Sequence, residues 1–333
     1  MSTIKVNAIE STASGGVAAK IASINDGALS NRNLLHNSSF EVWQRGTAFA
    51  SGASGGNRYT ADRWSVPRRT RAAQSTDVPA GFKYALLLDR EQTGGAEPFT
   101  VSQGIEADNI RFTGSYTLSF YAKSSDISTV NINVQDRTTV SEGGTSHSSI
   151  VTNQAVSITS SWARYTHTFT LSSIALSGTC LRISIGNTSA SQNDELLLTG
   201  IQLETGSVAT DIEKRSFGHE LSLCQRYFQF IGKEGANATL AAGFTTTNTF
   251  FGYGCLSGGA MRTAPSIAID GTLSHLGYTQ TAVAAAASNL VSIGTGNKTF
   301  SLQISSTTTT TNLAGAYARM QNAASAMTFS AEL

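Results

Sequence analysis

Three segments of the chain, 117–123, 130–135 and 181–185, alternate apolar and polar side chains, which is the period of a half-buried strand. The apolar residues of each segment share one face, and the polar residues share the other. If the three strands are neighbours in a sheet, their polar faces form one surface of amides, hydroxyls, cations and one aromatic ring. The candidate binding residues on this surface are Tyr121, Lys123, Asn131, Asn133, Gln135 and Arg182.

A surface of this composition suits a sugar, because amides and guanidinium groups match pairs of hydroxyls and an aromatic ring packs on the C–H side of a sugar ring. Trp162 starts another strand-like segment and is expected either to cover a strand edge or to act as a stacking platform. An ordinary solvated sheet face shows the same alternation. Alternation locates polar faces and not ligand sites, so both interpretations stay open.

The motifs of common enzymes are incomplete or misplaced in this sequence. Residues 52–56 match G-x-S-x-G, but they lie in a Gly/Ser-rich loop, whereas the nucleophile motif needs a strand before it and a helix after it. The histidines lack the spacing of zinc motifs, and no phosphate-binding loop is complete. Paired carboxylates for glycoside hydrolysis assemble in space, yet Asp and Glu together number only 22. We expect no catalytic residues and a protein that is not an enzyme.

Composition restricts the class of protein further. Charged residues make up 14% of the chain, against about 25% in typical globular domains. The net charge is +1 and no basic block is present, which argues against nucleic acid as a main partner. No apolar run is long enough to span a bilayer, and no secretory signal is evident. The three cysteines, Cys180, Cys224 and Cys255, are far apart and are expected to be buried free thiols.

Many short strand-like segments, separated by Gly, Ser, Asn and Asp, predict an all-β fold of the sandwich or jelly-roll type. Trp43 and Trp64 are expected in its core, and Asp62 with Arg63 is expected to form a structural pair. The main strands are expected at 84–88, 99–103, 116–123, 129–135, 163–171, 180–185 and 195–203.

The chain is expected to have four parts. An extended N-terminal arm is followed by a jelly-roll β-sandwich, a short amphipathic helix and a second small β domain. The arm is too small and polar to bury a core alone. The expected boundaries are 1–33 for the arm, 34–213 for the sandwich, 214–231 for the helix and 232–333 for the second β domain.

The helix is expected from a change of period after the last strand of the sandwich. Phe217, Leu221, Cys224 and Phe228 recur at helical spacing and form one apolar stripe. Ser216 is a suitable N-cap, since its hydroxyl can accept a hydrogen bond from an amide of the first turn.

The second β domain is small for a self-sufficient core, and three aromatic residues are expected close together on its outer faces: Phe250, Phe251 and Tyr253. Burial against other copies of the chain would solve both problems, which favours a homotrimer. A compact monomeric domain is the alternative.

Two sets of sequence stretches resemble known families. QLETGSVAT…ELSLCQRYFQ, NLLHNSSFEVWQRGT…YTADRW and the N-terminal STIKVNAIES resemble tail-fibre and receptor-binding proteins of bacteriophages. GSYTLSFYAKSS, SSWARYTHTFTL and LLLTGIQLETG resemble a carbohydrate-binding jelly-roll family.

The resemblance implies a virion protein, a tail fibre assembled in the host cytoplasm. Residues 1–33 would attach to other tail or capsid proteins, the sandwich would recognise polysaccharide of the host cell surface, and the protein would not insert into a membrane. Similar jelly rolls often carry a structural calcium ion, although no acidic loop here identifies its ligands; no other cofactor is expected. The alternatives are a head fibre or capsid decoration protein, and a polysaccharide depolymerase.

Overall fold

The computed structural model describes the chain from Asn31 onward, with gaps in several loops. The predicted N-terminal arm up to residue 30, and residues 53–55 of the G-x-S-x-G match, lie outside the described residues. The described ranges are 31–52, 56–90, 97–138, 146–173, 178–232, 239–246, 249–270, 273–277, 282–285, 290–295, 298–305, 313–320 and 326–333.

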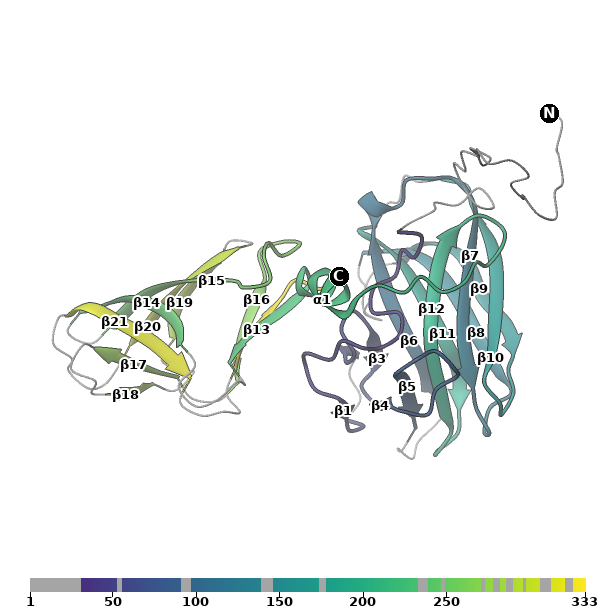
Figure 1. Cartoon of the computed structure of the whole chain (residues 1–333), viewed down its shortest axis with the longest axis horizontal. Helices are drawn as coiled ribbons and strands as arrows, with labels where there is room; N and C mark the ends of the chain where they lie inside the picture. Colours follow the sequence, from purple (N-terminus) through teal and green to yellow (C-terminus); the bar gives the residue numbers. More distant parts are fainter. Residues whose placement is uncertain are drawn as a thin grey trace, which may run out of the picture.

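Two antiparallel sheets pack face to face as a β-sandwich (Figure 1). In the described residues, the first sheet contains, in spatial order, β1 (Ala48–Phe49), β4 (Arg71–Ser75), β5 (Ala85–Asp89), β12 (Glu195–Thr205), β7 (Gly114–Lys123) and β10 (Ala163–Leu171). The second contains β2 (Asn57–Tyr59), β3 (Ser65–Pro67), β6 (Glu97–Glu106), β11 (Cys180–Ala190), β8 (Thr129–Arg137) and β9 (Ser146–Ser157). A short 3-10 helix, η1 (Ala107–Asn109), follows β6.

The core of the sandwich lies between these sheets and follows directly from the alternation of the sequence. In β8 every second residue is buried, because Val130, Ile132 and Val134 point inward while the residues between them are half-buried. Trp64 is fully buried, as predicted, whereas Trp43 packs half-buried at the margin of the core. The predicted all-β sandwich with one short helix is therefore confirmed.

The helix α1 spans Phe217–Gln225, and Ser216 caps it as predicted, with its hydroxyl accepting from the amide of His219 at 3.4 Å. The predicted apolar stripe is wrong in two respects. Phe228 lies outside the helix and begins β13, and Phe217 is 54% exposed. The buried face of α1 carries Glu220, because this carboxylate accepts from the backbone amide of Asn37 and pairs with a neighbouring arginine.

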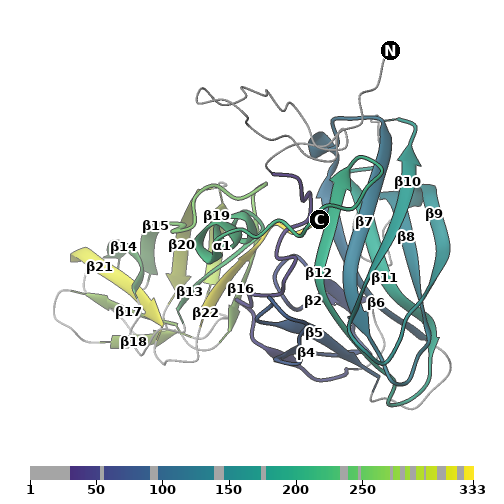
Figure 2. The ribbon, with the colours of Figure 1, turned by 45° about the vertical axis from the view of Figure 1, so that its right-hand side comes forward.

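The strands after α1 form a separate body beside the sandwich (Figures 1 and 2). In the described residues, one sheet has the order β13 (Phe228–Gly232), β22 (Ala326–Ser330) and β16 (Ser266–Asp270). The other has the order β18 (Ala282–Ala285), β17 (Leu273–Gly277), β21 (Leu313–Met320), β14 (Thr239–Thr246), β15 (Thr249–Cys255), β20 (Thr299–Ser305) and β19 (Leu290–Thr295).

The aromatic residues of β15 do not all lie on an outer face. Phe250 is fully buried in the core of this body, which corrects the prediction. Tyr253 is 72% exposed, and Phe251 stacks on Phe244 of β14 with ring centroids 5.3 Å apart. We call Phe244, Phe251 and Tyr253 the β15 aromatic patch. The exposed position of Cys255 at the end of the same strand corrects the expectation of three buried thiols.

Asp62 and Arg63 do not pair with each other, because each has another partner. Asp62 forms an ion pair with Arg45 at 3.0 Å, and Arg63 forms one with Glu332. Arg45 also pairs with Glu332 at 3.0 Å, and the guanidinium of Arg63 lies 3.4 Å from the ring centroid of Tyr227. These contacts join the sandwich to the residues that flank β13 and β22.

Candidate functional site

The structure divides the predicted binding residues between two opposite surfaces. Tyr121 and Lys123 belong to β7 of the first sheet, whereas the other four belong to β8 and β11 of the second sheet. The prediction assumed that the three strands were neighbours, and this is wrong for β7. The set on the second sheet consists of Asn131, Asn133, Gln135 and Arg182.

On the second sheet, these four residues do lie together. Arg182 is directly opposite Gln135 in the register of β11 and β8, and Asn133 is opposite Ser184. Arg182 is only 7% exposed and donates to the hydroxyl of Ser102 at 3.0 Å. Asn133 accepts from the amide of Asn153, and Gln135 donates weakly to a serine of β9. Much of this polar face is therefore engaged in contacts within the sheet.

On the first sheet, Tyr121 and Lys123 point outward next to Trp162, which precedes β10. The β7–β10 register pairs Ala122 with Ala163, so Lys123 lies across from Trp162. The ammonium of Lys123 is 5.9 Å from the centroid of the Trp162 ring. Trp162 and Tyr121 are both half-buried, which leaves part of each ring open to solvent.

Asp77 connects Lys123 and Trp162 through its two carboxylate oxygens. One oxygen accepts from the indole nitrogen of Trp162 at 2.9 Å, and the other accepts from Lys123 at 2.5 Å. These hydrogen bonds, the one from Lys123 first, lower the pKa of Asp77. Asp77 is thus held as a carboxylate that fixes the indole ring and the ammonium group in place.

Phe82 completes this surface from the turn before β5. Its ring lies 5.1 Å from that of Tyr121 at a tilt of 60°. Gly200 of β12 leaves the space for both rings, because a Cβ there would come within 2.6 Å of Phe82 and 3.0 Å of Tyr121. We call Asp77, Phe82, Tyr121, Lys123 and Trp162 the Trp162 face.

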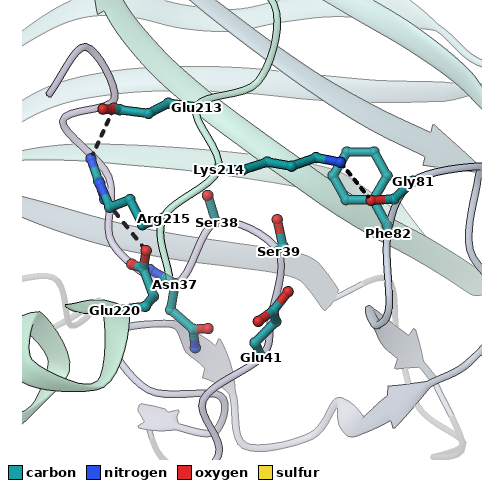
Figure 3. Close-up of a pocket in the computed structure, with 10 residues that line it drawn as sticks. All are labelled: Asn37, Ser38, Ser39, Glu41, Gly81, Phe82, Glu213, Lys214, Arg215 and Glu220. Carbon is teal, nitrogen blue, oxygen red and sulfur yellow. Dashed lines mark hydrogen bonds and ion pairs between the residues drawn. The ribbon is translucent and has the colours of Figure 1, made fainter. Parts of the chain in front are cut away.

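Phe82 also lines a small pocket (Figure 3). Lys214 donates to the carbonyl of Gly81 at 3.1 Å, and Arg215 pairs with both Glu213 and Glu220. The pocket encloses about 110 Å³, whereas ligand pockets usually measure about 300–1,000 Å³. It is too small for a separate ligand site.

No family model matches this chain. No curated protein matches it either. Solved structures with a similar sandwich include the CBM22-1 xylan-binding domain of Paenibacillus barcinonensis Xyn10C, with 16% identity over 53% of this chain and 96% of that chain, at a TM-score of 0.35.

Two further solved structures have likenesses of the same extent. One is TmCBM61 in complex with β-1,4-galactotriose, with 16% identity over 52% of this chain and 97% of that chain, at a TM-score of 0.29. The other is the enzymatically active domain of tailspike protein 4 from bacteriophage CBA120, with 12% identity over 52% of this chain and 21% of that chain, at a TM-score of 0.32. At these values, the likenesses carry no inference about a ligand.

Sequence reasoning missed Phe82 and Asp77, because both come from the turn region between β4 and β5 and not from an alternating strand. The one available signal was an aromatic residue directly after Gly81, in a stretch with turn-forming Pro79 and Gly81.

Within the described ranges, no group of three or more His, Cys, Asp or Glu side chains lies together as a metal site. The structural calcium ion stays a prediction. No helix in the described part of the chain has the length and apolar character to cross a bilayer.

Proposed function

We propose that this chain is a non-enzymatic carbohydrate-binding subunit of a phage virion, a tail fibre that recognises polysaccharide of the host surface. The observation that supports this proposal is the Trp162 face, where Phe82, Tyr121 and Trp162 present partly open rings beside a fixed ion pair. Aromatic rings pack on the apolar side of a sugar, and the charged groups form hydrogen bonds to its hydroxyls.

The chemistry of Asp77 favours binding over hydrolysis. A general acid in a glycosidase needs a raised pKa so that it holds its proton. The pKa of Asp77 is lowered instead, and its oxygens already accept from Lys123 and Trp162. A carboxylate in this state orients neighbouring groups and does not deliver a proton.

The two ends of the chain serve assembly of the fibre. Residues 1–33 attach the subunit to other virion proteins, and the body after α1 associates with two further copies through the β15 aromatic patch. Three copies hold three glycan sites at high effective concentration, so weak individual sites bind a polymer strongly. A head fibre or capsid decoration protein would share the attachment but not the glycan binding.

The test is binding of the purified full chain to intact host cells and to their extracted polysaccharide, with new reducing ends measured in parallel. We expect saturable binding without new reducing ends. Trp162→Ala and Tyr121→Ala should each weaken binding roughly tenfold, because each removes an aromatic platform. Asn133→Ala is the matched control on the opposite sheet.

The outcome of the binding experiment decides which surface of the sandwich binds the glycan. Loss with Asn133→Ala but not with Trp162→Ala would move the site to the second sheet. Release of reducing ends would indicate a depolymerase. The absence of any binding would favour the structural role on the capsid.

A further inference from the structure

A second, larger cleft lies where the sandwich meets α1. It encloses about 640 Å³, within the usual range of about 300–1,000 Å³ for ligand sites. One wall comes from the loop between η1 and β7, which carries Arg111 and Phe112. Another part of the lining comes from α1 and the residues directly after it, including His219 and Arg226.

The side chains that line this cleft carry positive charge without a carboxylate among them. Four guanidinium groups, from Arg32, Arg111, Arg215 and Arg226, line it together with two imidazoles. The carboxylates that balance the charge lie outside the lining. Arg226 forms two hydrogen bonds with Glu106 at 2.9 and 3.1 Å, and Arg215 is held by ion pairs of its own. These pairs hold two guanidinium groups at the cleft in fixed positions.

Arg111 differs from these two arginines. Its side chain is exposed, and no hydrogen bond or ion pair joins it to any described residue. A planar guanidinium of this kind can accommodate a carboxylate through two parallel hydrogen bonds. The cleft therefore contains one uncommitted cation next to two that are already positioned.

Phe112 supplies an aromatic surface at the same place. Its side chain is 63% exposed, although its backbone is fixed by the hydroxyl of Tyr116, which donates to the Phe112 carbonyl at 2.7 Å. Ile110, two residues earlier, is buried in the core of the sandwich. The loop thus anchors the backbone beneath an exposed ring, which suits packing on the apolar side of a sugar ring.

His36 lines the same cleft and lies among positively charged groups. Its Nδ1 atom is buried without a hydrogen-bond partner in the described structure. Burial, followed by the charges of Arg63, Arg215, Arg226 and His219, holds its pKa well below the usual value. Burial disfavours any charge on His36, whereas the smaller contribution of the neighbouring cations has the sign that attracts an anion.

We propose that this cleft binds a carboxylate-bearing saccharide, with Arg111 pairing with the carboxylate and Phe112 packing on the sugar ring. The proposal concerns a site separate from the Trp162 face, and it holds whether or not that face binds a neutral glycan. A long polyanion such as nucleic acid fits less well, since the chain carries a net charge of only +1.

The experiment is a calorimetric titration of the full chain with an oligogalacturonate trisaccharide and with the same trisaccharide after its carboxyl groups have been reduced to alcohols. We expect the acidic form to bind and the reduced form to bind at least tenfold more weakly, because charge-assisted hydrogen bonds are lost. Higher ionic strength should weaken binding of the acidic form.

Two variants at exposed positions locate the site. Arg111→Ala should weaken binding of the acidic trisaccharide about tenfold, and Phe112→Ala should weaken it several-fold. Arg68→Ala, which removes an exposed arginine of the turn between β3 and β4, is the matched control and should leave binding unchanged. Titration of Trp162→Ala separates this site from the proposed function, because binding of the acidic trisaccharide that remains in this variant and is lost in Arg111→Ala belongs to the cleft.

Three outcomes would overturn the proposal. They are equal binding of the acidic and reduced trisaccharides, unchanged binding by Arg111→Ala, and competition by inorganic phosphate at the same concentration as the saccharide. The last outcome would indicate a simple anion site in which the sugar ring has no part.

Discussion

Arg63 and Glu332 form an ion pair in which both side chains are almost fully buried, with 1% and 5% of their surfaces exposed. Arg63 comes from the loop before β3, and Glu332 follows β22, so the pair connects the two bodies of the molecule. Arg45 binds the second oxygen of the same carboxylate at 3.0 Å. Glu332 is therefore the common partner of two arginines at the junction.

Removal of this carboxylate should destabilise the protein strongly. Glu332→Ala leaves the buried guanidinium of Arg63 without its ion-pair partner, and we expect the free energy of unfolding to fall by about 3–5 kcal/mol. Chemical denaturation measures this change. Glu195→Gln, at an exposed carboxylate, is the control and should stay within about 0.5 kcal/mol of the parent chain. A similar small change for Glu332→Ala would mean that the pair contributes little.

Gly200 should be required for the geometry of the Trp162 face. Its φ is +59°, and a Cβ would come within 2.6 Å of the Phe82 ring, so Gly200→Ala should displace that ring. We expect a loss of about 1–2 kcal/mol in stability from the backbone conformation and weaker glycan binding from the displaced ring. Gly56→Ala shares the positive φ, at +66°, but has open space around it. Gly56→Ala should therefore lose stability while its glycan binding is unchanged. Equal glycan binding by Gly200→Ala and Gly56→Ala would exclude a role for Phe82.

His36 should make the protein less stable as the pH falls below about 6.5. Its pKa in the folded state is well below 6.5, chiefly because it is buried, so the unfolded chain binds a proton that the folded chain does not. The folded state therefore loses up to about 1.4 kcal/mol per pH unit in this range. Urea denaturation at several pH values should show this loss, and His36→Phe should reduce it.

Asp62 changes the stability with pH in the opposite direction, so its contribution must be separated from that of His36. Burial raises the pKa of Asp62 to about 6 despite the opposing charge of Arg45. Between the ordinary pKa of 3.8 and about pH 6, the folded state therefore binds a proton that the unfolded state does not bind. Protonation of Asp62 stabilises the folded state in this range, and this stabilisation is lost as the pH rises through about 6. The difference between the parent chain and His36→Phe isolates histidine. Parallel curves for the two proteins would contradict the prediction.

One thiol should react in the native protein and three in the unfolded protein. Cys255 is exposed, whereas Cys180 and Cys224 are buried, and burial raises the pKa of Cys180 to about 11. A thiol-reactive chromophore counts the accessible cysteines. Cys255→Ser should abolish the fast reaction, and any rapid reaction that remains would show that a buried cysteine becomes accessible.

The β15 aromatic patch should control self-association. Tyr253→Ser and Phe251→Ser remove apolar surface from the outer face of the sheet and leave the core unchanged. We therefore expect the trimers of these variants to dissociate at higher protein concentrations than the trimer of the parent chain. Sedimentation equilibrium at micromolar concentration measures the assembly. Phe217→Ser, at the exposed phenylalanine of α1, is the control. A parent chain that sediments as a monomer would refute the trimer.

Local sequence patterns predicted strands well and strand neighbours poorly. The strand from Ala163 to Leu171 was predicted with its observed bounds, because period-two alternation depends only on which residues face the core. Pairing depends on contacts between distant segments, and alternation contains no information about them. Tyr121 and Asn133 therefore have similar patterns although they lie on opposite sheets.

The candidate site could be predicted only in part for the same reason. Tyr121, Lys123 and Trp162 were identified from strand-like segments, but Phe82 comes from a turn and its ring fills the space that a side chain at Gly200 would take. In α1, helical spacing indicated an apolar buried face. The amide of Asn37 and the guanidinium of Arg215 instead made burial of the Glu220 carboxylate favourable.

The paired strands β13 and β22 determine how the molecule responds to force. They lie side by side, with Tyr227 just before the first strand and Glu332 just after the second. A single linker would let the two bodies rotate relative to each other. Here β13 and β22 both connect to the sandwich and are hydrogen-bonded to each other, which resists bending and torsion. A pull on the outer body should therefore be shared between both strands and should reach the sandwich through the ion pairs of Arg63 and Arg45 with Glu332. The two bodies should therefore move together as one rigid unit.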